Sequence, residues 1–95
     1  MTPPAVLVVV RTRDPHRQAE ALRAALGLTL RGSRVEVAIE ATSETAIETA
    51  IDPLATPLAR RAADTLRSFG YPVAALTGEA LAAALARAAR VEVWT

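Results

Sequence analysis

Residues 6–10 read VLVVV, an unbroken apolar run in which four of the five side chains are β-branched. A strand with one face in water alternates apolar and polar residues, whereas a strand covered on both faces does not. We therefore predict that residues 6–10 form a central strand of a parallel sheet. Parallel strands need long crossover connections, usually helices, so helices are expected between the strands.

The residues that follow this run, RTRDP at 11–15, predict the start of a helix. The Asp14 side chain can accept hydrogen bonds from the first free amides of a helix, and Pro15 fits the first helical position because no donor is needed there. The helix is expected to stop at Gly32. An apolar stripe recurs along it at Leu22, Leu26 and Leu30.

The rest of the chain continues to alternate strands with helices. Residues 35–39 (VEVAI) alternate apolar and less apolar side chains, which predicts a strand near a sheet edge. Thr56 and Pro57 repeat the combination of cap and proline and begin a helix that ends at Gly70. A strand at 72–76, a helix that opens at 77–79 and a strand at 91–94 complete the pattern. The side chains expected to face inward from the two later helices are Leu58, Ala62, Leu66, Phe69, Leu81, Leu85 and Ala88.

These elements predict a single domain over residues 1–95, an α/β three-layer sandwich with a four-stranded, mainly parallel sheet. With the strands numbered along the chain, the expected order is 2-1-3-4, because it places the run at 6–10 inside the sheet. Residues 40–56 combine helical spacing of apolar side chains with threonines that disfavour a helix. We expect a short helical turn within a long loop there, which serves as a lid, an interface or a plain connection.

The side chains available for chemistry are few. All 11 basic residues are arginine, the acidic residues number 10, and the chain has no lysine, asparagine or cysteine. This composition excludes Schiff-base and thiol chemistry, disulfides and cysteine metal sites. A formal charge of +1 argues against a nucleic-acid partner. The chain begins without the basic region of a signal peptide and has no apolar run long enough for a membrane span, so we expect a cytoplasmic protein with no membrane partner.

Alanine accounts for much of the apolar content. The chain has 22 alanines against 23 valines, leucines and isoleucines together. Alanine lets helices pack closely but buries little area, and a domain of this length folds with a small margin of stability. We therefore expect the chain to associate with further copies of itself.

The expected strand order also places a candidate site. Ligands bind beyond the carboxyl ends of parallel strands where the strand order reverses, which here would be between the first and third strands. A helix amino terminus at that point would attract an anion. The candidate anion-binding residues are Arg11, Thr12, Arg13, His16, Arg17, Thr77 and Gly78. A plainer interpretation is that Arg11 and Arg13 are surface charges, that Arg17 pairs with Glu20 or Asp14, and that the histidine is an exposed helical residue.

We expect no catalytic residue, no metal and no cofactor. His16 is the only histidine and has no second ligand near it in the sequence. Neither GxGxxG nor GxxxxGKS/T occurs, and Ser33 and Ser43 lack the GxSxG setting of a nucleophile. Most of the glutamates at 36, 40, 44 and 48 are expected to be solvated, and Tyr71 and Trp94 are expected to serve in packing or at an interface.

Three stretches carry a family resemblance: VLVVVRTRDP (6–15) followed by a helix, RGSRVEVAIE (31–40) as helix end and strand, and LRSFGYPVAALTGEALAAALARAARVEVWT (66–95) as helix, strand, helix and strand. In this layout the chain resembles the DsrE/DsrF/DsrH superfamily of small α/β proteins, which includes the sulfur-relay subunits TusB, TusC and TusD. The resemblance implies trimers or hexamers, homomeric or mixed. It also implies that members which carry sulfur do so on a cysteine just beyond the third strand.

That position falls at Leu76-Thr77, and no cysteine exists in the chain to hold a persulfide. A threonine hydroxyl is protonated at neutral pH and cannot replace the thiolate. The resemblance therefore implies a cysteine-less member that does not transfer sulfur itself. Residues 40–56 also depart from the glycine-containing turn that usually follows the second strand of the family.

Two functions remain as hypotheses. The first is a non-catalytic, DsrE-like binding or assembly subunit that supports a sulfur-relay or sulfur-metabolism partner. It would act as a homo-oligomer (trimer, hexamer or dimer) or together with a cysteine-bearing relative. The alternative is a small-molecule binding protein or minor enzyme that holds phosphate, sulfate or a nucleotide at residues 11–17.

Overall fold

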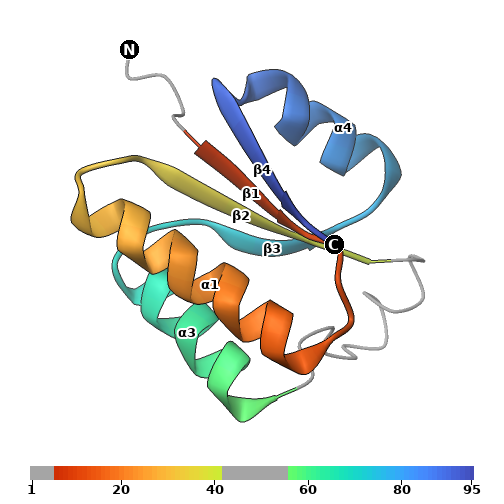
Figure 1. Cartoon of the computed structure of the whole chain (residues 1–95). Helices are drawn as coiled ribbons and strands as arrows, with labels where there is room; N and C mark the ends of the chain where they lie inside the picture. The colour runs from red at the N-terminus through yellow and green to blue at the C-terminus, as the bar shows by residue number, and fades with distance from the viewer. Residues whose placement is uncertain (1–5, 42–55) are drawn as a thin grey trace.

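The computed structural model of this chain describes residues 6–41 and 56–95 (Figure 1). The helical turn and lid predicted within residues 40–56 therefore fall almost wholly outside the described residues. The elements are β1 (Val6–Val10), α1 (Pro15–Leu30), β2 (Val35–Glu40), α3 (Pro57–Ser68), β3 (Val73–Leu76), α4 (Gly78–Arg87) and β4 (Arg90–Trp94).

The strands form one sheet in the order β3-β2-β1-β4, and every neighbouring pair is parallel. The predicted parallel sheet and the internal position of β1 are confirmed. The predicted order 2-1-3-4 is wrong, because β3 pairs with β2 and β4 pairs with β1. The strand at 35–39, predicted near an edge, is internal. Its glutamates are compatible with this position because they are half-buried and pair with arginines, Glu36 with Arg87 and Glu40 with Arg11.

Helices cover both faces of the sheet, so the predicted three layers are present (Figure 1). The steps from β1 to β2 and from β2 to β3 run in the same direction, and right-handed crossovers place α1 and α3 side by side on one face. The step from β3 to β4 runs back across the sheet, which places α4 on the opposite face. There Ala84 packs with Leu7, Val9 and Ala38.

The two helix starts predicted from a cap followed by a proline are confirmed. Asp14 accepts hydrogen bonds from two amides at the start of α1, and the Thr56 hydroxyl accepts one from the amide of Ala59 at the start of α3. A proline occupies the first turn in each case. Gly32 follows α1 with a φ of 84°, a left-handed conformation that glycine adopts without steric cost.

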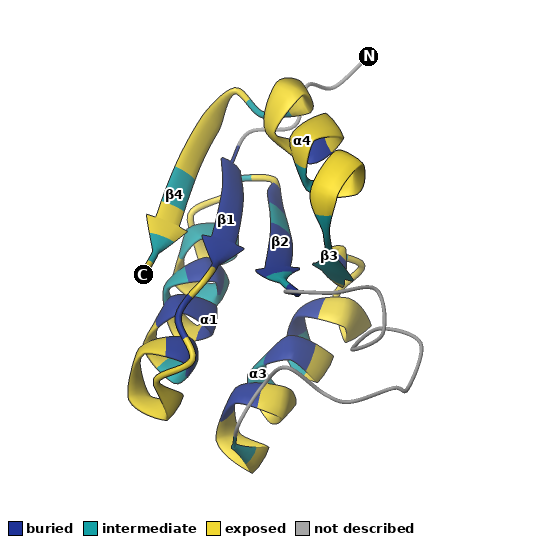
Figure 2. Cartoon of the chain, turned by 90° about the vertical axis from the view of Figure 1, so that its right-hand side faces the viewer, coloured by how far each residue is buried: buried dark blue, intermediate teal, exposed yellow. Residues whose placement is uncertain are grey.

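The apolar stripes of the helices differ from the prediction. Leu30, Leu58 and Phe69, expected to face inward, are 86%, 54% and 64% exposed. Figure 2 shows the buried residues of α1 and α3 on the sides that face the sheet and each other. Those positions belong to Ala21, Leu22 and Ala25 in α1 and to Ala59, Ala63 and Leu66 in α3. Small side chains at the contact let the two helices and the sheet approach closely.

The layer of α4 covers its face of the sheet only in part. Ala84 is buried and Leu81 and Ala88 are half-buried, whereas Leu85, also expected to face inward, is 42% exposed. Within the described ranges, no helix has the length and apolar character that a bilayer crossing requires.

Candidate functional site

The strand order reverses between β1 and β4, so the place where open parallel sheets bind ligands lies there and not between the first and third strands as predicted. In this protein the chain's own groups occupy that place. The amides of Arg11 and Thr12 both donate to the carbonyl of Trp94, at 2.9 and 3.0 Å. Thr12 is buried, and its carbonyl accepts a hydrogen bond from Nε2 of the fully buried Gln18 at 3.1 Å.

The amino terminus of α1 is also occupied. Oδ1 of Asp14 accepts from the amides of His16 at 2.8 Å and Arg17 at 3.1 Å. Pro15 has no amide hydrogen, and the amide of Gln18 donates to the carbonyl of Asp14 at 2.9 Å. Every amide of the first turn therefore has a partner within the chain. An anion at this end of the helix would have to displace the Asp14 carboxylate or rely on side chains alone.

Two of the predicted arginines converge on one residue, Glu40, at the end of β2. Nε of Arg11 lies 2.6 Å from the carboxylate of Glu40, and Nη2 of Arg13 donates to its main-chain carbonyl at 2.8 Å. The prediction treated Glu40 as a solvated glutamate and missed this role. The signal was present in the pattern, because the last residue of a parallel strand lies at the same sheet edge as the residues that follow its neighbour.

Arg17 makes neither of the pairs expected of it with Glu20 or Asp14. Its Nε donates to the carbonyl of Thr95 at 2.7 Å, and its guanidinium lies 5.4 Å from the centre of the Trp94 ring, within the range of a cation–π interaction. No local pattern indicated the contact of Arg17 with Trp94, which joins residues 77 positions apart through the pairing of β1 with β4. The adjacent His16 is exposed, as the plainer interpretation had it.

Thr77 and Gly78 begin α4, as predicted, but they do not adjoin the arginine loop. Since β2 lies between β3 and β1, the ends of those two strands are about 10 Å apart, twice the spacing of neighbouring strands. Thr77 is the residue before α4, its side chain makes no capping hydrogen bond, and Gly78 has a φ of 45°. Across the described ranges, no three histidine, aspartate or glutamate side chains are grouped so that they could hold a metal ion.

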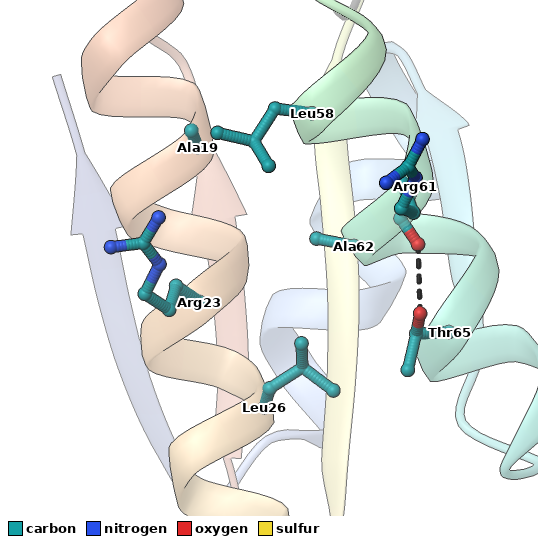
Figure 3. Close-up of a pocket in the computed structure, with 7 residues that line it drawn as sticks. All are labelled: Ala19, Arg23, Leu26, Leu58, Arg61, Ala62 and Thr65. Carbon is teal, nitrogen blue, oxygen red and sulfur yellow. Dashed lines mark hydrogen bonds between the residues drawn. The ribbon is translucent and has the colours of Figure 1, made fainter.

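A groove of about 210 Å³ runs between α1 and α3 on the outside of the molecule (Figure 3). Its residues are Ala19, Arg23, Leu26, Leu58, Arg61, Ala62 and Thr65. Figure 3 shows Leu58 reaching across toward Ala19, with Arg23 and Arg61 on opposite sides. The sequence analysis missed this groove because it assigned Leu26, Leu58 and Ala62 to the core.

These observations define a small α/β protein with a four-stranded, all-parallel sheet of alternating strand–helix units. The sheet edge at which such proteins bind ligands is held together by arginine, glutamate and main-chain contacts. Comparison of the chain with protein-family models, with curated proteins and with solved structures gives no match in any of the three.

Proposed function

We propose that this chain is a binding or assembly subunit without catalytic activity of its own. The observation that carries the proposal is the number of large apolar side chains left on its surface. In the described part of the chain these are Leu30, Leu58, Phe69, Leu85, Val91 and Val93, each at least 39% exposed. Removing apolar surface from water contributes about 25 cal/mol for each Å², so a partner that covers them would bind favourably.

The polar groups at the carboxyl edge of the sheet support the same proposal. A catalytic or ligand-binding site needs groups that converge on a space that the ligand can enter. Here Arg11 forms an ion pair with Glu40, and Arg13 donates a hydrogen bond to its carbonyl. Asp14 accepts hydrogen bonds from the first amides of α1. Their contacts join β1, β2 and α1 to one another, which is a structural role.

The DsrE-like resemblance extends this proposal to sulfur metabolism in the cytoplasm. The layered α/β architecture is compatible with it, and the lack of cysteine assigns the sulfur-carrying step to another subunit. Co-expression with a cysteine-bearing subunit of DsrE type, followed by sizing of the mixture, tests this extension. A common complex is expected, and separate migration of the two chains would contradict it.

Self-association is the direct test of the assembly function. Sedimentation velocity across the micromolar concentration range should show species heavier than the 10.0 kDa of one chain. The fraction of the heavier species should rise with concentration by mass action. A sedimentation coefficient that stays at the monomer value at every concentration, together with no complex with a cysteine-bearing subunit, would overturn the proposal.

A second candidate is the holding of a phosphate, sulfate or nucleotide by the arginine side chains of residues 11–17. It is favoured by the placement of Arg11, Arg13 and Arg17 at one sheet edge. Inorganic phosphate should then raise the melting temperature of the wild type, because a ligand that binds only the folded form stabilises it. Arg13→Ala should lose this response. No response in the wild type, or an equal response in the variant, would eliminate this candidate.

A further inference from the structure

Among the described residues, no strand pairs with the outer edge of β4. Because Trp94 accepts the amides of Arg11 and Thr12, its peptide groups face β1, and those of Val91 and Val93 face outward since neighbouring residues of a strand alternate. The outward amides and carbonyls of Val91 and Val93 have no hydrogen-bond partner among the described residues. Figure 2 shows β4 as the most exposed strand of the sheet.

The opposite edge of the sheet differs. The amide of Val37 donates to Pro72 and that of Ala41 to Leu76, so the outward groups of β3 include the carbonyl of Val73. That carbonyl accepts a hydrogen bond from Nε of Arg67 at 3.1 Å. A side chain of the protein thus covers one outward carbonyl of the β3 edge, whereas no group in the described ranges does so at β4.

We propose that β4 pairs with β4 of a second copy of this chain, antiparallel about a twofold axis at Val91, to form one continuous eight-stranded sheet. This inference rests on the proposed assembly function and names its surface. A twofold dimer requires a self-complementary edge. The residue on the axis lies opposite its own copy, and the other residues pair reciprocally, so that if one residue faces a second, the second also faces the first. The charges of β4 meet this requirement in one register.

With Val91 opposite Val91 of the second copy, Arg90 of each chain stands opposite Glu92 of the other. Within one chain these two side chains already lie 2.6 Å apart on one face of the strand. The dimer would therefore place four charges of alternating sign together. A shift that centres the pairing on Glu92 sets two carboxylates directly opposite each other, which is unfavourable, and a shift to Val93 sets Glu92 opposite Trp94 and loses the pairs of Arg90 with Glu92.

The backbone and the apolar side chains agree with this register. The outward amide and carbonyl of Val91 would form two hydrogen bonds with the same groups of Val91 in the second copy. β4 begins at Arg90, and the chain bends at Ala89, so the pairing is centred on residues 90–92. Val91 and Val93, which are 39% and 51% exposed, would then lie beside apolar side chains of the second copy.

The helices leave room for this arrangement. Two β1 strands would be separated by three strand spacings, about 14 Å, whereas a helix is about 10 Å wide. Each α1 contacts β2, β1 and β4 of its own sheet to a similar extent, so it lies over β1, the middle one of the three. The two copies of α1 could therefore lie side by side without overlap.

Reversal of the charges tests this register. Arg90→Glu and Glu92→Arg each place like charges opposite one another across the twofold axis, and each should weaken dimerisation about tenfold or more because two attractive pairs become repulsive. An equimolar mixture of the two variants should dimerise again, since every opposing pair is then of opposite sign. Glu20→Arg and Arg23→Glu make the same charge changes on exposed positions of α1 and should leave dimerisation unchanged.

A backbone variant provides an independent test. Val91→Pro removes an amide hydrogen that points away from the sheet, a position where an edge strand tolerates proline, and should abolish the dimer. Val91→Thr keeps the amide and should retain it. Circular dichroism and melting curves establish that each variant folds, and sedimentation velocity measures its mass.

The outcomes separate this inference from the function on which it rests. Loss of the dimer in both charge variants and its recovery in their mixture would support the β4 pairing. If the wild type self-associates and the Arg90, Glu92 and Val91 variants do so equally, the pairing is wrong while the assembly function stands. If the wild type is a monomer throughout, the pairing fails, and assembly with a different subunit is decided by the co-expression experiment.

Discussion

Replacement of Asp14 tests the account of the candidate site most directly. Asp14→Ala removes the acceptor of two hydrogen bonds, from His16 at 2.8 Å and Arg17 at 3.1 Å, and leaves both amides exposed to water. Loss of a helix cap of this type costs about 1 kcal/mol of folding free energy. The lost attraction between a carboxylate and the helix dipole adds ~0.3–1 kcal/mol at low salt. For a domain of this size each kcal/mol corresponds to about 4–8 °C in melting temperature.

Asp14→Asn is the matched control. It loses the same charge but keeps an oxygen that can accept hydrogen bonds from the same amides. Its folding free energy should therefore fall only by the attraction between the charge and the helix dipole, which salt screens. Melting curves of the wild type and both variants at low and high salt separate the two contributions. The difference between Asp14→Ala and Asp14→Asn should be about 1 kcal/mol and independent of salt.

Phosphate makes the same experiment informative about function. In Asp14→Ala the vacated amides of α1 form an anion site of the usual helix-terminus type, so phosphate should raise the melting temperature of this variant more than that of the wild type. The reasoning is refuted if Asp14→Ala and Asp14→Asn are equally stable. A phosphate response of the wild type as large as that of Asp14→Ala would likewise show that Asp14 does not occupy the site.

Two further predictions concern the core. Leu66→Ala should lower the free energy of unfolding by about 2–5 kcal/mol because Leu66 is fully buried, while Leu30→Ala, at a residue 86% exposed, should change it by no more than about 0.5 kcal/mol. Urea unfolding measures both, and equal effects would contradict the assigned faces of the helices. Gln18→Met keeps the bulk of the side chain but leaves the carbonyl of Thr12 without its donor, and should cost about 1–3 kcal/mol in the same assay. An unchanged midpoint for this variant would mean that water replaces the amide at the end of β1.

Much of the fold could be predicted because local signals determined it. The combination of Asp14 and Pro15 marks the start of α1, and that of Thr56 and Pro57 marks the start of α3, through hydrogen bonds that span three residues or fewer. The unbroken apolar run of β1 likewise indicates that this strand is buried on both faces. Each of these signals depends on a few neighbouring residues and not on which strands pair.

The strand order could not be predicted because composition does not identify a strand's neighbours. β2 carries Glu36 and Glu40 and resembles an edge strand, but α4 covers its face only in part and arginines pair with both glutamates. β3 is an edge strand despite its apolar sequence. Its position beyond β2 follows from the packing of α3 beside α1, a contact between segments far apart in the sequence.

The error in strand order also explains why Thr77 and Gly78 were assigned to the candidate site. The order 2-1-3-4 would have brought Thr77 beside the arginine loop with an open space between them. β2 lies beside β1 in both orders and ends at Glu40, so the nearest anion to Arg11 and Arg13 is part of the protein itself. The residue types at the edge were recognised, but their partner depended on the register of β1 with β2.

The apolar stripe of α3 connects the fold with the proposed function. The predicted stripe of Leu58, Ala62, Leu66 and Phe69 and the observed stripe of Ala59, Ala63 and Leu66 share one residue and have similar helical spacing. Periodicity alone cannot choose between them, whereas close packing against α1 and the sheet favours the stripe with the smaller side chains. The larger residues are thereby turned outward, where water is an unfavourable neighbour. A second molecule that covers Leu58 and Phe69 would remove these apolar side chains from water. The apolar residues that were wrongly assigned to the core therefore support assembly.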